Sequence, residues 1–111
     1  MLGFPSYLHT DDLDCNSYRV DGLIFDIDGN YWTDQTLTVH ISADGFDQVI
    51  PITVPQDYST PAWQVDLPAT ASNFIVQLQK RNDMPASPAY KLARNKDCFW
   101  NITQVWFQQA Y

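Results

Sequence analysis

The residues with the clearest capacity for chemistry lie in the segment LIFDIDGNYWTD, residues 23–34. Its carboxylates Asp26, Asp28 and Asp34, together with Asn30, supply oxygen atoms at alternate and later positions after an apolar run. Hard cations such as Ca²⁺ bind carboxylate and amide oxygens, although the spacing here departs from that of an EF-hand loop. The segment therefore predicts either a looser structural calcium site or an ordinary solvated turn.

The same segment also resembles the first motif of the haloacid-dehalogenase phosphotransferases, a strand followed by Asp-x-Asp-Gly. That resemblance implies that Asp26 attacks phosphorus and that Asp28 acts as general acid and base, with Mg²⁺ between them. Such enzymes need a Lys and a further acidic pair on a parallel sheet with crossover helices, and the sequence shows no helical crossover. No Gly-rich phosphate loop and no Ser or Cys with a base at motif spacing is visible either. We therefore expect that the protein is not an enzyme.

Aromatic residues offer a different chemistry, because the chain has four Trp, six Tyr and six Phe. Most should pack in a core, and Trp63, Trp100 and Trp106, which lie in strand-like runs, are expected in the core or at a strand edge. Tyr31 and Trp32 instead follow Asn30 in a polar turn, and Tyr58 and Tyr90 lie in the loop-like segments PQDYSTP and SPAYKL. Rings flanked by amides and charges suit sugars, whose C–H faces stack on the rings while polar groups bind the hydroxyls. The alternative for Tyr31 and Trp32 is a cover over one end of the fold.

The charge of the chain restricts its partners. Its 13 acidic residues are all Asp, and with 6 Lys plus Arg they give a net charge of −7. Nucleic acids and anionic membranes require a basic face, so both are excluded as partners, whereas neutral or cationic ligands remain. Because Asp suits turns better than helix interiors, we expect few helices.

The elements that must position these residues are strands. Residues 36–42, TLTVHIS, alternate apolar and polar side chains as a half-buried strand does. The same alternation runs through residues 48–54, 62–68 and 73–80, with turn residues between the runs. Residues 18–27, interrupted at Gly22, and residues 98–107, apolar on both faces, predict two more strands. The shared pattern predicts a core made of Leu37, Val39, Ile41, Ile52, Val65, Leu67, Phe74, Val76 and Leu78.

Six to eight short strands in about a hundred residues predict an all-β fold, an antiparallel β-sandwich of the immunoglobulin-like kind. We expect residues 18–111 to form this single domain and residues 1–17 to be an irregular N-terminal segment. Pro51 within its run predicts an edge strand or a bulge, because proline cannot donate to a ladder. No apolar run is long enough to span a bilayer as a helix.

Two cysteines, Cys15 and Cys98, lie near opposite ends of the chain. We expect them to form one disulfide in oxidising conditions; the alternative is two unpaired thiols, and two cysteines cannot form a four-cysteine metal cage. A disulfide would favour an extracellular or cell-surface protein, with this chain as one domain of a longer exported protein. The sequon Asn101-Ile102-Thr103 falls inside an expected strand, so we interpret it as chance.

The order of these features resembles that of starch-binding carbohydrate-binding modules. The resemblance rests on the strand GLIFDI, the turn GNYWTD, the strand TLTVHIS and the segment AWQVDLPATASNFIVQLQKRND. It implies a non-catalytic module without a cofactor that binds a neutral polysaccharide, starch or another α-glucan. The alternative is a structural or adhesive spacer of a cell-surface protein. The residues that the resemblance assigns to sugar binding are Tyr31, Trp32, Gln79, Lys80, Asn82 and Tyr90.

Overall fold

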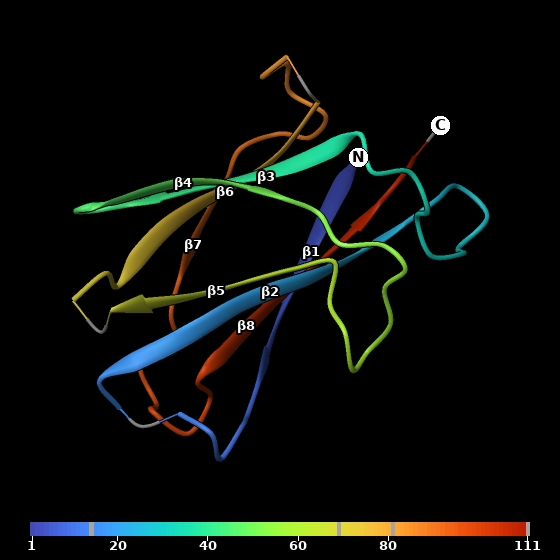
Figure 1. Cartoon of the computed structure of the whole chain (residues 1–111). Helices are drawn as coiled ribbons and strands as arrows, with labels where there is room; N and C mark the ends of the chain where they lie inside the picture. The colour runs from blue at the N-terminus through green and yellow to red at the C-terminus, as the bar shows by residue number, and fades with distance from the viewer. Residues whose placement is uncertain (14, 69, 81, 111) are drawn as a thin grey trace.

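The computed structural model describes residues 1–13, 15–68, 70–80 and 82–110, and the fold is all-β (Figure 1). The strands are β1 (Leu2–Leu8), β2 (Ser17–Phe25), β3 (Leu37–Ala43), β4 (Phe46–Pro51), β5 (Trp63–Pro68), β6 (Asn73–Lys80), β7 (Tyr90–Ala93) and β8 (Ile102–Gln108). They form two four-stranded sheets that pack as a sandwich. We call the sheet with order β1-β8-β2-β5 sheet A and the sheet with order β4-β3-β6-β7 sheet B. The predicted sandwich is confirmed.

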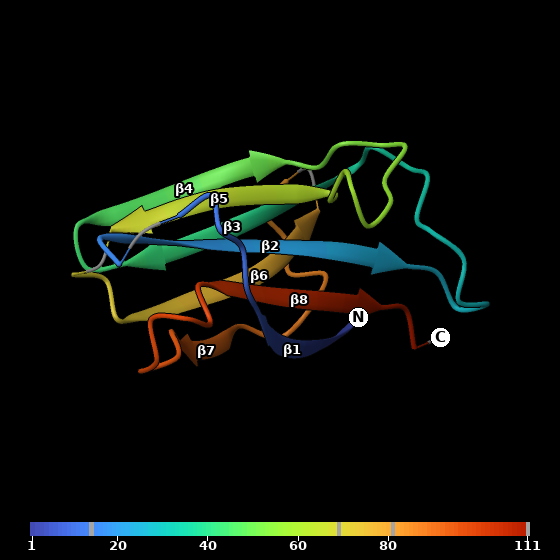
Figure 2. The same cartoon turned by 90° about the horizontal axis from the view of Figure 1, so that it is seen from below.

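Sheet A contains the one departure from antiparallel pairing among the named strands. Strand β8 runs antiparallel to β1 but parallel to β2, and both termini of the chain lie at the same end of the sandwich. In sheet B every pair is antiparallel. Figure 2 looks onto sheet A, with sheet B behind it. The C-terminal ends of β2 and β8 therefore lie side by side at one end of the sandwich, which brings distant parts of the sequence together.

The inner faces of the two sheets form the core, as the alternating pattern predicts. Eight of the nine predicted core residues are buried, and the ninth, Val65, is half-buried and packs against them. Trp63 is also buried. Its neighbour across the ladder is Gly22, where an added Cβ would lie 2.4 Å from the indole. Gly22 therefore makes room for Trp63, and β2 continues through it without interruption.

Two sequence predictions about the ends of the chain need correction. Residues 1–17 are not wholly irregular, because Leu2–Leu8 pairs along its full length with β8. Six of its seven residues are exposed, apolar ones included, so the strand lacks the alternation of buried apolar and exposed polar residues that reveals a strand. The last strand begins at Ile102 and not at Cys98. It is covered on both faces, in agreement with its apolar composition. Pro51 does end an edge strand, β4.

Among the described residues, no helix has the length and apolar character that crossing a membrane would require.

Candidate functional site

Tyr31 and Trp32, the two aromatic residues expected to stack on sugars, have different environments. Trp32 is half-buried against the hydrophobic core, and its indole N–H donates a 2.8 Å hydrogen bond to the carbonyl oxygen of Asp34. Tyr31 forms an isolated bridge with Phe25, and the two rings stack with centroids 5.3 Å apart. Tyr31 is therefore part of a surface aromatic group, whereas Trp32 closes one end of the sandwich.

The surface group is larger than the sequence indicated. Phe25 also contacts Trp106 of β8, with ring centroids 5.4 Å apart, and Tyr58 contacts Trp106 at 5.7 Å. Tyr58 is 65% exposed, and the other three rings are half-buried. We call Phe25, Tyr31, Tyr58 and Trp106 the aromatic platform. It lies on the outer face of sheet A, where β2 and β8 end.

Two short turns position the outer rings of the platform. In the first, the carboxylate of Asp26 accepts hydrogen bonds of 2.9 Å from the backbone N–H groups of Asp28 and Asn30, which places Tyr31 beside Phe25. In the second, the carboxylate of Asp57 accepts hydrogen bonds from Ser59 and Thr60. Asp favours such turns because its short side chain reaches backbone N–H groups two residues on. These aspartates therefore organise turns.

The side chain of Gln56 anchors the loop that carries Tyr58. Its amide accepts a 2.9 Å hydrogen bond from the N–H of Ile24 and donates a 2.8 Å bond to the carbonyl oxygen of Ile24. Gln56, which is 5% exposed, thus supplies the hydrogen bonds that a neighbouring strand would give to β2 beyond Trp63, where β5 begins. The loop is thereby fixed to β2, and Tyr58 is held over Trp106.

A polar chain of three side chains supports the centre of the platform. The indole N–H of Trp106 donates a 2.6 Å hydrogen bond to Gln104 Oε1, and Gln104 Nε2 donates a 3.1 Å bond to Asp21 Oδ1. Asp21 and Gln104 are each 6% exposed. Burial raises the pKa of Asp21, while the hydrogen bond from Gln104 and the charge of Arg19 lower it by less. Arg19 itself pairs with Asp66 of β5 at 3.3 Å.

The other predicted sugar contacts do not join the platform. Gln79 is buried on the outer face of sheet B, on the opposite side of the sandwich, where it donates to Gln77. Lys80 and Asn82 are exposed at the end of β6. Tyr90 was expected in a loop, which is wrong, because it begins β7. Its ring packs 6.2 Å from that of Phe107, and its hydroxyl accepts a hydrogen bond from the N–H of Gly3.

The predicted calcium ligands do not converge either. Asp34 accepts a hydrogen bond from the N–H of Thr36 within its own turn, and Asp26 binds the turn described above. Among residues 1–13, 15–68, 70–80 and 82–110, no group of three or more His, Cys, Asp and Glu side chains could hold a metal ion. Three carboxylates and Asn30 therefore supply no preformed ligand set in this structure.

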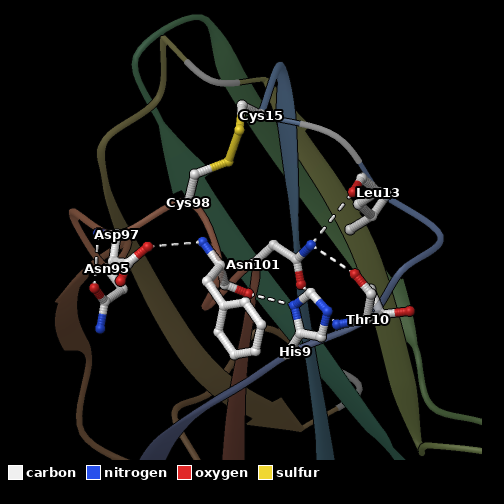
Figure 3. Close-up of a disulfide and its surroundings, with 9 residues drawn as sticks. His9, Thr10, Leu13, Cys15, Asn95, Asp97, Cys98 and Asn101 are labelled. Carbon is white, nitrogen blue, oxygen red and sulfur yellow. Dashed lines mark hydrogen bonds between the residues drawn. A yellow bond between two sulfur atoms is a disulfide. The ribbon is translucent and has the colours of Figure 1, made fainter.

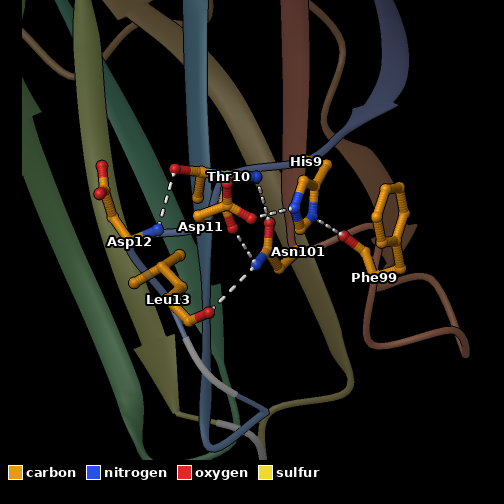
Figure 4. Close-up of polar contacts among 7 residues, drawn as sticks. All are labelled: His9, Thr10, Asp11, Asp12, Leu13, Phe99 and Asn101. Carbon is orange, nitrogen blue, oxygen red and sulfur yellow. Dashed lines mark hydrogen bonds and ion pairs between the residues drawn. The ribbon is translucent and has the colours of Figure 1, made fainter.

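The far end of sheet A is held by a disulfide and a buried amide. Cys15 and Cys98 are bonded, with their Cα atoms 5.6 Å apart (Figure 3). Beside them Asn101, 3% exposed, donates through Nδ2 to the carbonyl oxygens of Thr10 and Leu13 (Figure 4). This amide nitrogen is the atom to which a glycan would be attached. In the folded protein this nitrogen is therefore engaged in packing hydrogen bonds.

No protein-family model matches this sequence, and neither a curated protein nor a solved structure shows significant similarity to the chain.

Proposed function

We propose that the protein is a non-catalytic carbohydrate-binding module whose ligand lies against the aromatic platform. The observation that carries the proposal is the contact of Trp106 with both Phe25 and Tyr58 on an outer sheet face. A monomeric domain gains nothing in solubility from exposed rings, and large exposed apolar patches mark binding surfaces. Phe4, directly opposite Trp106 in the ladder and 55% exposed, extends the surface onto β1.

The chemistry of the surface favours a neutral glycan. The net charge of −7 opposes acidic polymers, whereas ring faces stack on the C–H faces of sugars whatever the charge of the chain. The rings of Phe25 and Tyr58 are inclined by 54° and 59° to that of Trp106. Such a surface is curved and not flat. It suits a coiled chain such as starch or another α-glucan better than a flat crystalline surface.

The proposal extends to the setting of the protein. The Cys15–Cys98 disulfide is compatible with an oxidising compartment, where disulfides persist. We therefore propose an extracellular or cell-surface protein in which this chain is one module of a larger multidomain polypeptide. Each stacked ring should contribute roughly 1–2 kcal/mol, by analogy with aromatic pairs, so the dissociation constant should lie in the micromolar to millimolar range.

Affinity gel electrophoresis tests the proposal. The native protein should be retarded in gels that contain soluble starch or glycogen and should migrate normally in gels without polysaccharide. Tyr58→Ala and Trp106→Ala should each lose most of the retardation. Trp100→Ala is the matched control, because Trp100 is 42% exposed in the turn before β8, outside the platform. Normal migration of the native protein in every polysaccharide gel would contradict the proposal and favour the structural spacer.

A further inference from the structure

Asp21 is buried beneath the centre of the platform, although the fold does not require a carboxylate at this position. Asp21 points to the outer face of sheet A, as its place in the ladder opposite Gln104 and its hydrogen bond to that residue show. Burying an ionised carboxylate costs free energy unless its partners compensate. An apolar residue at this position, like the neighbouring Leu23 on the same face, would avoid that cost.

The polarity of the chain of hydrogen bonds explains why a carboxylate is placed there. An indole N–H can only donate, and an ionised carboxylate can only accept. The amide of Gln104 between them is therefore restricted to one orientation, with Oε1 toward Trp106 and Nε2 toward Asp21. The reversed amide would oppose two donors at the indole and two acceptors at Asp21.

We infer that Asp21 and Gln104 are positioning residues of the platform, which fix the indole of Trp106 in the orientation that a sugar ring requires. The inference rests on the proposed function. Because the indole N–H is already bonded, Trp106 offers the ligand its ring surface and not a hydrogen-bond donor. The fixed ring then contacts Phe25 on one side and Tyr58 on the other.

The first test replaces Gln104 by Met, which keeps a side chain of similar length but neither hydrogen bond. The resonance of the Trp106 indole N–H, assigned by its loss in Trp106→Phe, should move upfield, because that proton loses its acceptor. Retardation by soluble starch should weaken roughly threefold to tenfold, the range expected for one hydrogen bond. Phe25 and Tyr58 stay in place, so the platform is not removed.

The second test uses pH. Lowering the pH should protonate Asp21, release the amide of Gln104 and weaken retardation of the native protein, whereas retardation of Asp21→Asn should be weaker at neutral pH and should not fall further. The charged group that acts on Asp21 is Arg19 on its own strand, which pairs with Asp66 of β5, and the residues opposite Asp21, Gln64 on β5 and Gln104 on β8, are uncharged. Asp66→Asn is therefore the control, and it should keep the acid-induced loss.

The outcomes separate this inference from the proposed function. If the native protein is retarded but Gln104→Met is retarded equally, or keeps the native indole resonance, the positioning role is wrong and the platform still binds glycan. If neither Tyr58→Ala nor Trp106→Ala changes the retardation, the platform is not the binding surface, and the inference fails with the proposed function. Should Gln104→Met fail to fold, Asp21→Asn at neutral pH decides, since unchanged retardation there contradicts the inference.

Discussion

The two outer faces of the sandwich use their side chains in opposite ways. On sheet B the outer face is mostly polar, apart from Val49 and Ile75, and its polar groups bind one another. His40 Nε2 lies 2.6 Å from Asp47 Oδ1. Gln79 donates a hydrogen bond to Gln77, and Gln77 donates one to the carbonyl oxygen of Ser87. On sheet A the corresponding face carries the rings of the aromatic platform. Under the proposed function, the outer face of sheet B meets solvent, whereas the rings on the outer face of sheet A meet a ligand.

The largest expected effect is on the free energy of unfolding, and it tests whether the two sheets share one core. Phe74 is 2% exposed between the sheets. Phe74→Ala should lower the free energy of unfolding by about 3–5 kcal/mol, because it leaves a cavity in the core. Denaturant unfolding followed by circular dichroism measures this loss. Its neighbour Ile75 points outward from sheet B, so Ile75→Ala should cost far less. Similar losses for the two variants would mean that the faces of β6 are assigned wrongly.

The next effect is specific to sheet A. The double variant Cys15→Ser, Cys98→Ser opens a loop with a sequence separation of 83 residues and should lower the free energy of unfolding by about 2–4 kcal/mol. Amide hydrogen exchange should accelerate first in β1 and at the start of β8, near the lost bond, while β3 and β6 remain protected. In the native, unreduced protein neither cysteine should react with an alkylating reagent. Alkylation of both would show that the bond is absent.

The contrast between the sheets also explains what the sequence could predict. In β3 and β6 one face is apolar and the other polar, so Leu37, Val39 and Ile41 show the period of two that identified their strand. Strands β2 and β8 lie at the centre of sheet A and are covered on both faces, so no alternation separates the inner from the outer side. The core was therefore predictable, whereas the outer face of sheet A was not.

The platform itself could not be found by reading along the chain. Phe25, Tyr58 and Trp106 lie in three separate segments, and the parallel pairing of β2 with β8 brings two of them together. Tyr31 was identified because it shares a polar turn with Trp32. The same polar neighbours left two roles open for Trp32, since nothing local shows whether the end of a sandwich is covered there. When the fold brings a site together from distant segments, the sequence shows the types of its residues but not that they are neighbours.

The third prediction separates these two aromatic roles. Trp32→Ala should lower the free energy of unfolding by about 1–3 kcal/mol, less than a fully buried Trp, because only part of the ring leaves the core. Tyr58→Ala should leave the melting temperature nearly unchanged, because 65% of this residue is already in solvent, and should weaken retardation by starch. Thermal unfolding and affinity gels measure the two effects. If Trp32→Ala kept its stability and Tyr58→Ala lost it, the two roles would be reversed.

The smallest expected effect is the change in the free energy of unfolding caused by Asp21→Asn, and its sign, a gain in stability, distinguishes it from the others. Burial raises the pKa of Asp21 in the folded protein above the ordinary value of 3.8 that it has in the unfolded chain. Between these two values the folded state holds a proton that the unfolded state has lost, so the free energy of unfolding falls as the pH rises through this window. Above the raised pKa the full cost of the buried charge is present. Asp21→Asn removes that charge and should be more stable than the native protein at pH 7.

The stability advantage of Asp21→Asn should shrink as the pH is lowered through the raised pKa, and the part that comes from the charge should vanish below 3.8, where the native carboxyl is neutral in both states. Urea unfolding of both proteins at a series of pH values measures it, and Asp66→Asn, which removes an equal charge from a side chain 54% exposed, controls for net charge. A variant that gains stability while losing affinity for starch shows a residue kept for binding at a cost to folding. A variant that is less stable than the native protein at pH 7 would instead make Asp21 a structural residue of sheet A, and the contrast between the two outer faces would then rest on the rings alone.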